Sequence, residues 1–270
     1  MGKFFPVREY FGRVSRGVRM MLARREFSIE DVARQLPSGG GGPGVFDTDA
    51  ARRLNEARMR HLDSLGLDLA GRTVADVGCG VGNLSGFFLE RGCRVFASDA
   101  REENIAELRR RHPDLPSRVL DIEVDPLAGH GMFEVVFCFG LLYHLENPLA
   151  GIRNMEAACS GLLLLETLVC DSPKPILYLV DEPAETRNQA AKGLGVRPSP
   201  AWVAMALHRC GFPYVYSTVS VPDHEDFHYE WKGSLAYSHA GHPIRCVFVG
   251  SKERLSNDRL RPLIDTPAPR

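Results

Sequence analysis

The sequence has no long hydrophobic run and almost no net charge. Its longest aliphatic stretch, Leu162–Leu165, is interrupted at Glu166, whereas a membrane-spanning helix needs about 20 consecutive apolar residues. The 33 Lys and Arg residues are balanced by 34 Asp and Glu residues, for a formal net charge of -1. A membrane span is therefore excluded. The chain also has no overall field that would attract nucleic acid or an anionic membrane surface.

The sequence also lacks cysteine pairs and an export signal. Its seven cysteines are scattered without a CxxC spacing, mostly inside apolar runs, which is typical of reduced core residues rather than of a disulfide framework. No apolar signal segment follows Met1 before the charged residues Arg8 and Glu9. These features predict a protein of the cytoplasm.

The composition is that of one globular domain with an appendage: 44% of the 270 residues are hydrophobic and 25% are charged. Residues 8–36 are locally basic with interspersed apolar residues, so we expect two short helices there. A solvated helix face is favoured over a nucleic-acid arm, and a homodimer through these helices stays open. We divide the chain into a helical extension with a Gly-rich linker (1–44), an α/β domain (45–250) and a C-terminal tail (251–270).

From residue 73 onward, short apolar runs alternate with amphipathic segments. Strands are expected at 73–77, 94–98, 118–120, 133–139, 162–168, 214–219 and 244–249. Helices are expected at 47–67, 84–91, 102–112, 149–159 and 200–210. This alternation is typical of a doubly wound, Rossmann-like α/β fold around a seven-stranded, mostly parallel sheet.

A glycine-rich loop follows the first of these strands. The strand ends at Val77, Gly78, Gly80 and Gly82 follow, and a helix is expected near Leu84. Glycines allow the tight turn and the close approach of the backbone to a ligand at the end of a sheet strand. Asp99 ends the second strand about 20 residues later, where an acid accepts the hydroxyls of a ribose. The pattern therefore predicts an adenosine-type cofactor.

Two residues decide between the adenosine cofactors. The dinucleotide fingerprint Gly-x-Gly-x-x-Gly is not met, because Asn83 stands where its third glycine belongs. Asp76 precedes the first glycine by two residues, and its carboxylate would repel a pyrophosphate but could orient an ammonium group, directly or through water. The loop therefore favours S-adenosylmethionine over NAD.

Val74–Asn83 resembles motif I of the class I S-adenosylmethionine-dependent methyltransferases, and residues 133–140 resemble the motif on their fourth strand. The resemblance covers about residues 45–250 and implies their fold, with an antiparallel strand pair at the end of the sheet. It implies that Asp99 binds the ribose, Asp121 the adenine amine and Ile122 the ring. The implied cofactor-binding residues are Asp76, Gly78, Cys79, Gly80, Gly82, Asn83, Asp99, Ala100, Asp121, Ile122, Phe139, Gly140 and Tyr143.

His144 is the candidate general base. It lies just beyond the fourth predicted strand, on the loop expected nearest the methyl group. A base is needed only when the acceptor is a poor nucleophile, such as an alcohol, since positioning supplies most of the remaining catalysis. The alternative is that His144 only caps its loop or lines the cofactor pocket.

A second resemblance is confined to the region after the fourth strand. Leu142–His144 with Pro148, Leu165–Val169 and Arg187 with Asn188 are similar to the tRNA wobble-uridine carboxymethyltransferases. In that family the corresponding arginine and tyrosine help to bind the cofactor or the acceptor. The segment before the glycine loop shows no match to the basic and aromatic residues with which that family recognises a carboxylated cofactor. Ordinary S-adenosylmethionine is therefore favoured, and the fuller pattern resembles bacterial methyltransferases of polysaccharide or secondary-metabolite pathways.

The acceptor side is expected to include the charged residue inside the fifth strand and two later polar segments. Glu166 interrupts an apolar strand, so it should pair with Arg187 or with a substrate group. Residues 181–200 are polar and loop-rich, and they form either a lid, an acceptor wall or a solvated loop. The candidate acceptor-binding residues are Glu166, Arg187, Asn188, His224, Tyr229 and Trp231.

Four histidines lie between residues 224 and 242, near several carboxylates, which raises the question of a metal site. No fixed-geometry spacing such as HExxH is present, and no metal is expected. An acceptor-binding loop, with Tyr229 or Trp231 stacked on a ring, is the favoured interpretation, and a loop joining the last two strands is the alternative.

We therefore expect an S-adenosylmethionine-dependent methyltransferase that acts on a small molecule, at an oxygen of a sugar or natural product. The alternatives are an RNA methyltransferase of the tRNA wobble-uridine type and a cofactor-binding protein without turnover.

Overall fold

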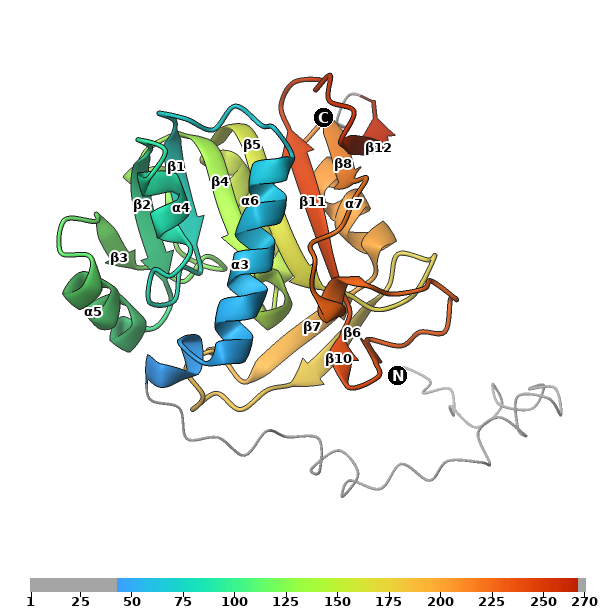
Figure 1. The fold of residues 1–270 in the computed structure, drawn as a ribbon, viewed down its shortest axis with the longest axis horizontal. Helices are drawn as coiled ribbons and strands as arrows, with labels where there is room; N and C mark the ends of the chain where they lie inside the picture. Colours follow the sequence, from blue (N-terminus) through green and yellow to red (C-terminus); the bar gives the residue numbers. More distant parts are fainter. Residues whose placement is uncertain (1–42, 267–270) are drawn as a thin grey trace, which may run out of the picture. The chain divides into compact units, whose positions relative to one another are not determined.

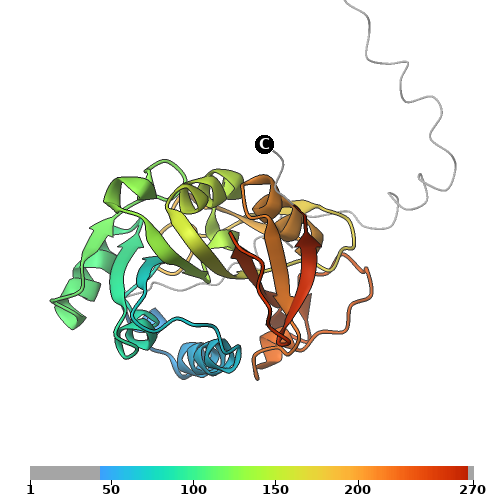
Figure 2. The same cartoon turned by 90° about the horizontal axis from the view of Figure 1, so that it is seen from above.

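The computed structural model describes residues 43–266, and the two predicted N-terminal helices lie outside this range. The described residues form an α/β fold in which helices cover both faces of one large sheet (Figures 1 and 2). The helices are α3 (Asp49–Ser64), α4 (Ser85–Leu89), α5 (Glu102–Arg111), α6 (Pro148–Ala157) and α7 (Pro200–Arg209). Short 3-10 turns are η2 (Pro43–Phe46), η3 (Leu127–His130), η4 (Leu142–His144) and η5 (Glu225–Phe227).

The central sheet has the strand order β12-β8-β11-β5-β4-β1-β2-β3. Its strands are β1 (Thr73–Val77), β2 (Arg94–Asp99), β3 (Ser117–Val119), β4 (Phe133–Phe139), β5 (Cys159–Leu168), β8 (Tyr214–Thr218), β11 (Arg245–Ser251) and β12 (Leu260–Asp265). The pairs from β5 to β3 are parallel, and those from β5 to β12 are antiparallel. The chain order reverses between β1 and β4, which is the switch point where open α/β sheets bind ligands.

Each face of the sheet carries its own apolar core. Ile152 of α6 and Val203 of α7 pack on one face, and Leu62 of α3, Phe88 of α4 and Leu108 of α5 pack on the other. β1 and β4 lie between these layers and are almost wholly buried, which explains their continuous apolar sequences. The doubly wound fold predicted from the alternation is confirmed.

Local signals in the sequence set the ends of the principal helices. The Thr48 side chain accepts a hydrogen bond from the Ala51 amide at the start of α3, and Ser199 caps α7 in the same way before Pro200. Such caps satisfy amide groups that have no partner inside the helix. α3 ends at Ser64, shortly before Gly66 with a φ of 63°, where glycine is favoured.

The sheet differs from the prediction at its C-terminal edge. It has eight strands rather than seven, because β12 comes from the segment predicted as a tail. Pro262 obscures this strand in the sequence, but β12 is an edge strand and its register shifts between Pro262 and Ile264. An edge strand tolerates a proline because its outer amide needs no partner.

A second difference concerns residues 181–200, predicted to be loop-rich. β6 (Leu177–Asp181) and β7 (Leu194–Pro198) pair there as a separate antiparallel hairpin. We call residues 182–193 the β6–β7 connection. A further two-residue ladder joins β9 (Ser238–His239) to β10 (His242–Pro243).

Candidate functional site

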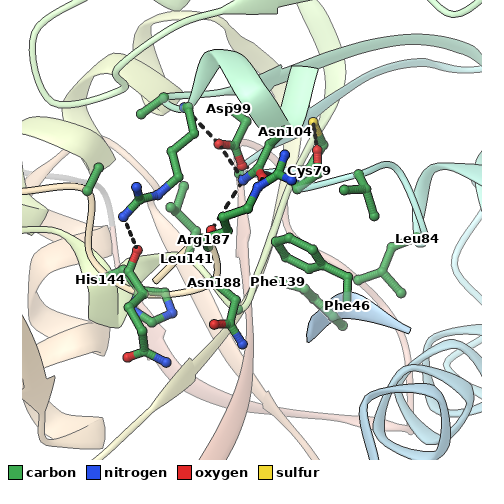
Figure 3. Close-up of a pocket in the computed structure, with 18 of the residues that line it drawn as sticks. Phe46, Cys79, Leu84, Asp99, Asn104, Phe139, Leu141, His144, Arg187 and Asn188 are labelled. Atoms are coloured by element: carbon green, nitrogen blue, oxygen red, sulfur yellow. Dashed lines mark hydrogen bonds between the residues drawn. The ribbon is translucent and has the colours of Figure 1, made fainter. Parts of the chain in front are cut away.

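A pocket opens at the carboxyl ends of the parallel strands, beside the glycine loop (Figure 3). Figure 3 shows Phe46 of η2 on one side of it, His144 on the opposite side and Arg187 between them. The pocket is lined by η2, α3, the glycine loop, the ends of β2 and β4, η4 and the β6–β7 connection. It therefore lies where the fold predicts a ligand.

The backbone of the glycine loop lies close to the pocket because two of its residues have no side chain. The amides of Gly78 and Cys79 donate to the Ser98 carbonyl at 2.8 and 2.9 Å, which ties the loop to β2. Gly78 has a φ of 75°, and a Cβ there would come within 2.8 Å of Leu141. Gly80 has a φ of 55°, and its Cβ would come within 2.9 Å of Phe46. Both positions require glycine, since other residues rarely adopt such a φ.

Asp99 holds the glycine loop and still has acceptor capacity. Its Oδ2 accepts from the Gly80 amide at 3.0 Å, and its Oδ1 accepts from the Arg101 amide and the Asn104 side chain. A carboxylate offers about four acceptor positions, so one remains for a ligand hydroxyl. Burial raises the pKa of Asp99 above its usual value despite these donors.

Most of the predicted cofactor-binding residues line this one pocket. They are Gly78, Cys79, Gly80, Asn83, Asp99, Ala100, Asp121, Phe139, Gly140 and Tyr143. The close glycine turn and the buried acid at the end of β2 suit the adenosine and the amino-acid tail of S-adenosylmethionine, so the residues present fit this cofactor.

Three other predicted cofactor residues lie behind the pocket wall. Asp76 is buried under the loop, where its Oδ2 accepts from the Ser85 hydroxyl at 2.6 Å, and burial raises its pKa to about 7. Gly82 faces Leu108 and His112. Ile122 packs in the core. Direct ligand contacts by these residues stay predictions.

His144 is placed by a carboxylate that the sequence analysis missed. Its Nδ1 lies 2.5 Å from Oε2 of Glu182, the first residue of the β6–β7 connection. The other oxygen of Glu182 accepts from Arg197 on β7 at 3.0 Å. Burial lowers the pKa of His144, although the Glu182 carboxylate opposes this shift. Glu182 was missed because only the β6–β7 hairpin brings it to η4.

Glu166 pairs with two arginines rather than with Arg187 as predicted. Its Oε2 lies 2.5 Å from Arg58 of α3, and its Oε1 lies 2.9 Å from Arg245 of β11. Burial alone would raise the pKa of Glu166, but the two guanidinium groups lower it below its usual value. Asp226 pairs in turn with Arg245 at 2.9 Å. Glu166 itself lies outside the pocket lining, whereas Arg58 and Arg245 line it.

A signal for Arg58 was present in the sequence. Arg58 falls four residues after Leu54 and four before Leu62, on the apolar stripe of α3, and it is buried. Its Nε is buried and has no hydrogen-bond partner within residues 43–266. An arginine on an apolar helix face indicates a buried ion pair or a ligand contact, because an unpaired buried charge is strongly disfavoured.

The β6–β7 connection forms a wall of the pocket that reaches from His144, which Glu182 contacts, to Asn104, which Arg187 contacts. Arg187 and Asn188 both line the pocket, and Arg187 Nε donates to the Asn104 side chain at 3.2 Å. Arg101 donates to the Ala184 carbonyl at 2.6 Å. Lys192 lies 2.9 Å from both Asp121 and Glu123 across the pocket mouth. The connection is therefore bound to the cofactor side of the pocket by several polar contacts.

The remaining predicted acceptor residues lie away from the pocket lining. His224 lies beside Asp226, with Nδ1 3.7 Å from Oδ1. The Tyr229 hydroxyl donates to Asp171 at 2.9 Å, and Trp231, half exposed, packs edge-on against Tyr229. Acceptor contacts by these three residues stay predictions.

Neither a metal cluster nor a membrane span is found in the part of the chain that the structure describes. No group of three or more His, Cys, Asp or Glu side chains there has an arrangement suited to a metal ion. No helix between residues 43 and 266 has the length and apolar character needed to cross a bilayer.

Comparisons with known proteins agree with this geometry. The methyltransferase domain family matches residues 46–215. The tRNA U34 carboxymethyltransferase of Alcanivorax borkumensis is 35% identical over 164 residues, which are 56% of this chain and 47% of that protein. Its counterpart from Methylococcus capsulatus is 31% identical over 196 residues, which are 68% of this chain and 59% of that protein. This chain therefore matches about half of the length of these curated relatives.

A solved structure gives the same fold. The N-terminal domain of EvdMO1, crystallised in the presence of SAH and D-fucose, aligns with a TM-score of 0.56 and 20% identity, covering 76% of this chain and 84% of that one. The family match covers the glycine loop, Asp99 and His144 alike. The chain therefore belongs to the methyltransferase domain family.

Proposed function

We propose that the protein transfers a methyl group to an oxygen of a small-molecule acceptor, a sugar or natural product, in the cytoplasm. The observation that carries this proposal is His144 on the pocket wall, opposite the glycine loop. Burial lowers its pKa, so the ring is neutral and able to accept a proton near pH 7. A hydroxyl acceptor needs such a base, because an alcohol is a weak nucleophile.

S-adenosylmethionine, when bound, supplies a methyl group on a sulfonium, and the neutral thioether that remains is a good leaving group. The residues of the protein bind and orient the cofactor and the acceptor. Gly78 and Gly80 let the backbone approach the ligand, and Asp99 has an acceptor position that we assign to a ribose hydroxyl. We assign Asp121, which lines the pocket, to the adenine amine. Gly140 follows β4 and lies next to Arg58, whose guanidinium would be 3.3 Å from a Cβ there.

The walls of the pocket favour a small acceptor. Phe46 covers one side and the β6–β7 connection covers the other. The cavity between them is about 250 Å³ and has to hold the cofactor as well, so we propose that the acceptor enters it with a compact group such as a single sugar ring. The EvdMO1 domain has the same fold and was crystallised in the presence of SAH and D-fucose, which supports a sugar as the acceptor.

The alternative is an RNA methyltransferase or carboxymethyltransferase of the tRNA wobble-uridine type. It is supported by the curated relatives and by Arg58. No basic match to that family was found before the glycine loop, yet Arg58 from that segment lines the pocket, and its buried Nε has no hydrogen-bond partner among the described residues. Such a group would suit a carboxylate on the cofactor.

The deciding experiment supplies S-adenosylmethionine, radiolabelled in its methyl group, with three acceptor sets: hydroxyl-bearing sugars, natural products and unmodified tRNA. We expect label only in a small-molecule product. Label in tRNA alone, or transfer only from the carboxylated cofactor, would overturn the small-molecule proposal in favour of the alternative. Binding of S-adenosylhomocysteine without any transfer would indicate a protein without turnover.

A further inference from the structure

We propose that Glu182 is a positioning residue for His144, which holds the ring so that Nε2 faces the acceptor hydroxyl. This inference rests on the proposed O-methyl transfer. It assigns a role to a residue that no sequence motif indicated, and it makes the β6–β7 connection part of the catalytic arrangement.

The contact between the two side chains is short and shielded from water. His144 Nδ1 and Glu182 Oε2 are 2.5 Å apart, and the side chains are 12% and 3% exposed. Burial alone would raise the pKa of Glu182, but the hydrogen bond from His144 and the charge of Arg197 lower it below its usual value. Glu182 is therefore ionised and can only accept, so Nδ1 carries the proton.

Glu182 is itself fixed from three directions. Arg197 donates to Oε1 at 3.0 Å, and the Ala190 amide donates to Oε2 at 2.9 Å. A Cβ at Gly195 would lie 2.7 Å from Oε1 and 2.5 Å from the Tyr143 carbonyl. The space for the carboxylate therefore exists because residue 195 has no side chain. A carboxylate with three donors cannot rotate away from His144 without losing hydrogen bonds.

The arrangement determines which ring nitrogen can act. With the proton on Nδ1, the lone pair is on Nε2, the nitrogen left free for the pocket. The charged groups that face His144 are Glu182, Arg197 of β7 and Arg245 of β11. The Tyr143 ring packs against His144, with centroids 4.0 Å apart. The two arginines oppose a second proton on the ring, and Glu182 is the nearby group that stabilises it.

In the proposed transfer step, His144 takes the proton and Glu182 compensates the charge that this proton brings. The acceptor oxygen forms a bond to the methyl carbon while the carbon–sulfur bond breaks and its electron pair stays on sulfur. The hydroxyl proton passes to Nε2 of His144. The resulting imidazolium lies against the Glu182 carboxylate, which compensates the new charge.

The first measurement does not depend on turnover. Imidazole ¹⁵N NMR of histidine-labelled protein, saturated with S-adenosylhomocysteine, reports the tautomer of His144, which is assigned by the loss of its signal in His144→Gln. We expect a protonated Nδ1 and an unprotonated Nε2. A proton on Nε2 in the wild-type protein would overturn the positioning role, whether or not an acceptor is known.

The second measurement uses Glu182→Gln and Glu182→Ala with the identified acceptor. We expect kcat to fall at least about tenfold for Ala and less for Gln, whose amide oxygen can still accept from Nδ1. KM and S-adenosylhomocysteine affinity should change little. Since the carboxylate raises the pKa of His144, both variants should shift the acidic limb of the kcat profile to lower pH.

The matched control is Asp181→Asn, which removes the same charge from the exposed neighbouring residue of β6. It should leave kcat and its pH profile unchanged. Loss of kcat in the Glu182 variants without a shift of the acidic limb would refute the positioning role. Failure to find any methyl acceptor would count against the proposed function and leave the tautomer result standing.

Discussion

The two halves of the pocket are built in different ways. The proposed cofactor half centres on one continuous stretch, in which β1, the glycine loop and the end of β2 are joined by backbone hydrogen bonds such as Gly78 to Ser98. The proposed acceptor half is assembled around α3, β5, the β6–β7 hairpin and β11, which are distant in sequence. It is held by buried ion pairs, with Glu166 and Glu182 at their centres. The first half depends on backbone geometry and the second on compensated charge.

This difference indicates in which half of the pocket amino-acid substitutions are tolerated. A backbone-built site keeps its shape when most side chains vary, provided that the glycines remain. A site built on buried charges loses its shape when one partner is removed, because the other is left uncompensated. We therefore expect the acceptor half to respond more strongly to single charge removals than the cofactor half.

The largest loss of stability should follow removal of the Glu166 carboxylate, which Arg58 and Arg245 share. Glu166→Ala leaves Arg58 and Arg245 buried beside each other, and we expect a loss of unfolding free energy of about 3–5 kcal/mol, measured by urea denaturation. Glu56→Ala removes the partner of an exposed ion pair with Arg60 on the same helix as Arg58 and should change stability little. Equal effects of the two substitutions would contradict the role of buried charge in the acceptor half.

A pH-dependent effect on stability should come from Asp76, the buried acid under the glycine loop. Burial raises the pKa of Asp76 to about 7 in the folded protein, whereas an unfolded Asp titrates near about 3.9. Between these values the native state holds a proton that the unfolded chain has lost, so stability falls as pH rises, by at most about 1.4 kcal/mol per pH unit. Asp76→Asn should abolish this slope in urea titrations at several pH values, whereas the exposed Asp114→Asn should keep it.

Cofactor affinity should respond to Asp99. Asp99→Ala removes a carboxyl acceptor from the predicted ribose position, and hydrogen bonds to such a group contribute up to about 1.5–3 kcal/mol when it is charged. Calorimetry with S-adenosylhomocysteine should therefore show a Kd raised roughly 10- to 100-fold. The variant also loses the bond to the Gly80 amide, so circular dichroism must show an intact fold. An unchanged Kd would remove the ribose assignment.

The smallest effect should be on the dissociation rate of S-adenosylhomocysteine when a contact of the β6–β7 connection is removed. Lys192→Ala removes the contacts to Asp121 and Glu123. Because Lys192 is partly exposed, each such ion pair contributes about 0.2–1 kcal/mol. S-adenosylhomocysteine should dissociate up to about five times faster in stopped-flow experiments, and high salt should reduce the difference. Lys232→Ala, whose partner Glu230 is exposed, serves as the control, and an equal change there would exclude a specific role for Lys192.

The same contrast explains what the sequence predicts well. The doubly wound fold follows from local periodicity, and the glycine loop with Asp99 follows from spacing. The other predicted cofactor residues rest mainly on the resemblance to the class I methyltransferases. Residues of the acceptor half meet only through tertiary contacts. Glu166 was predicted to meet Arg187 or a substrate group, and its actual partners Arg58 and Arg245 were not foreseen, because no local signal relates a strand residue to a helix 108 residues away. Glu182 was missed for the same reason.

The β12 strand has a consequence for how copies of the protein meet. It occupies one edge of the sheet and carries Pro262 beside a shift in register, while the other edge is β3, with three residues. Neither edge offers a long row of free amide and carbonyl groups on which a strand of another molecule could add. Among the described residues, β12 therefore protects the central sheet against edge-to-edge addition of another copy.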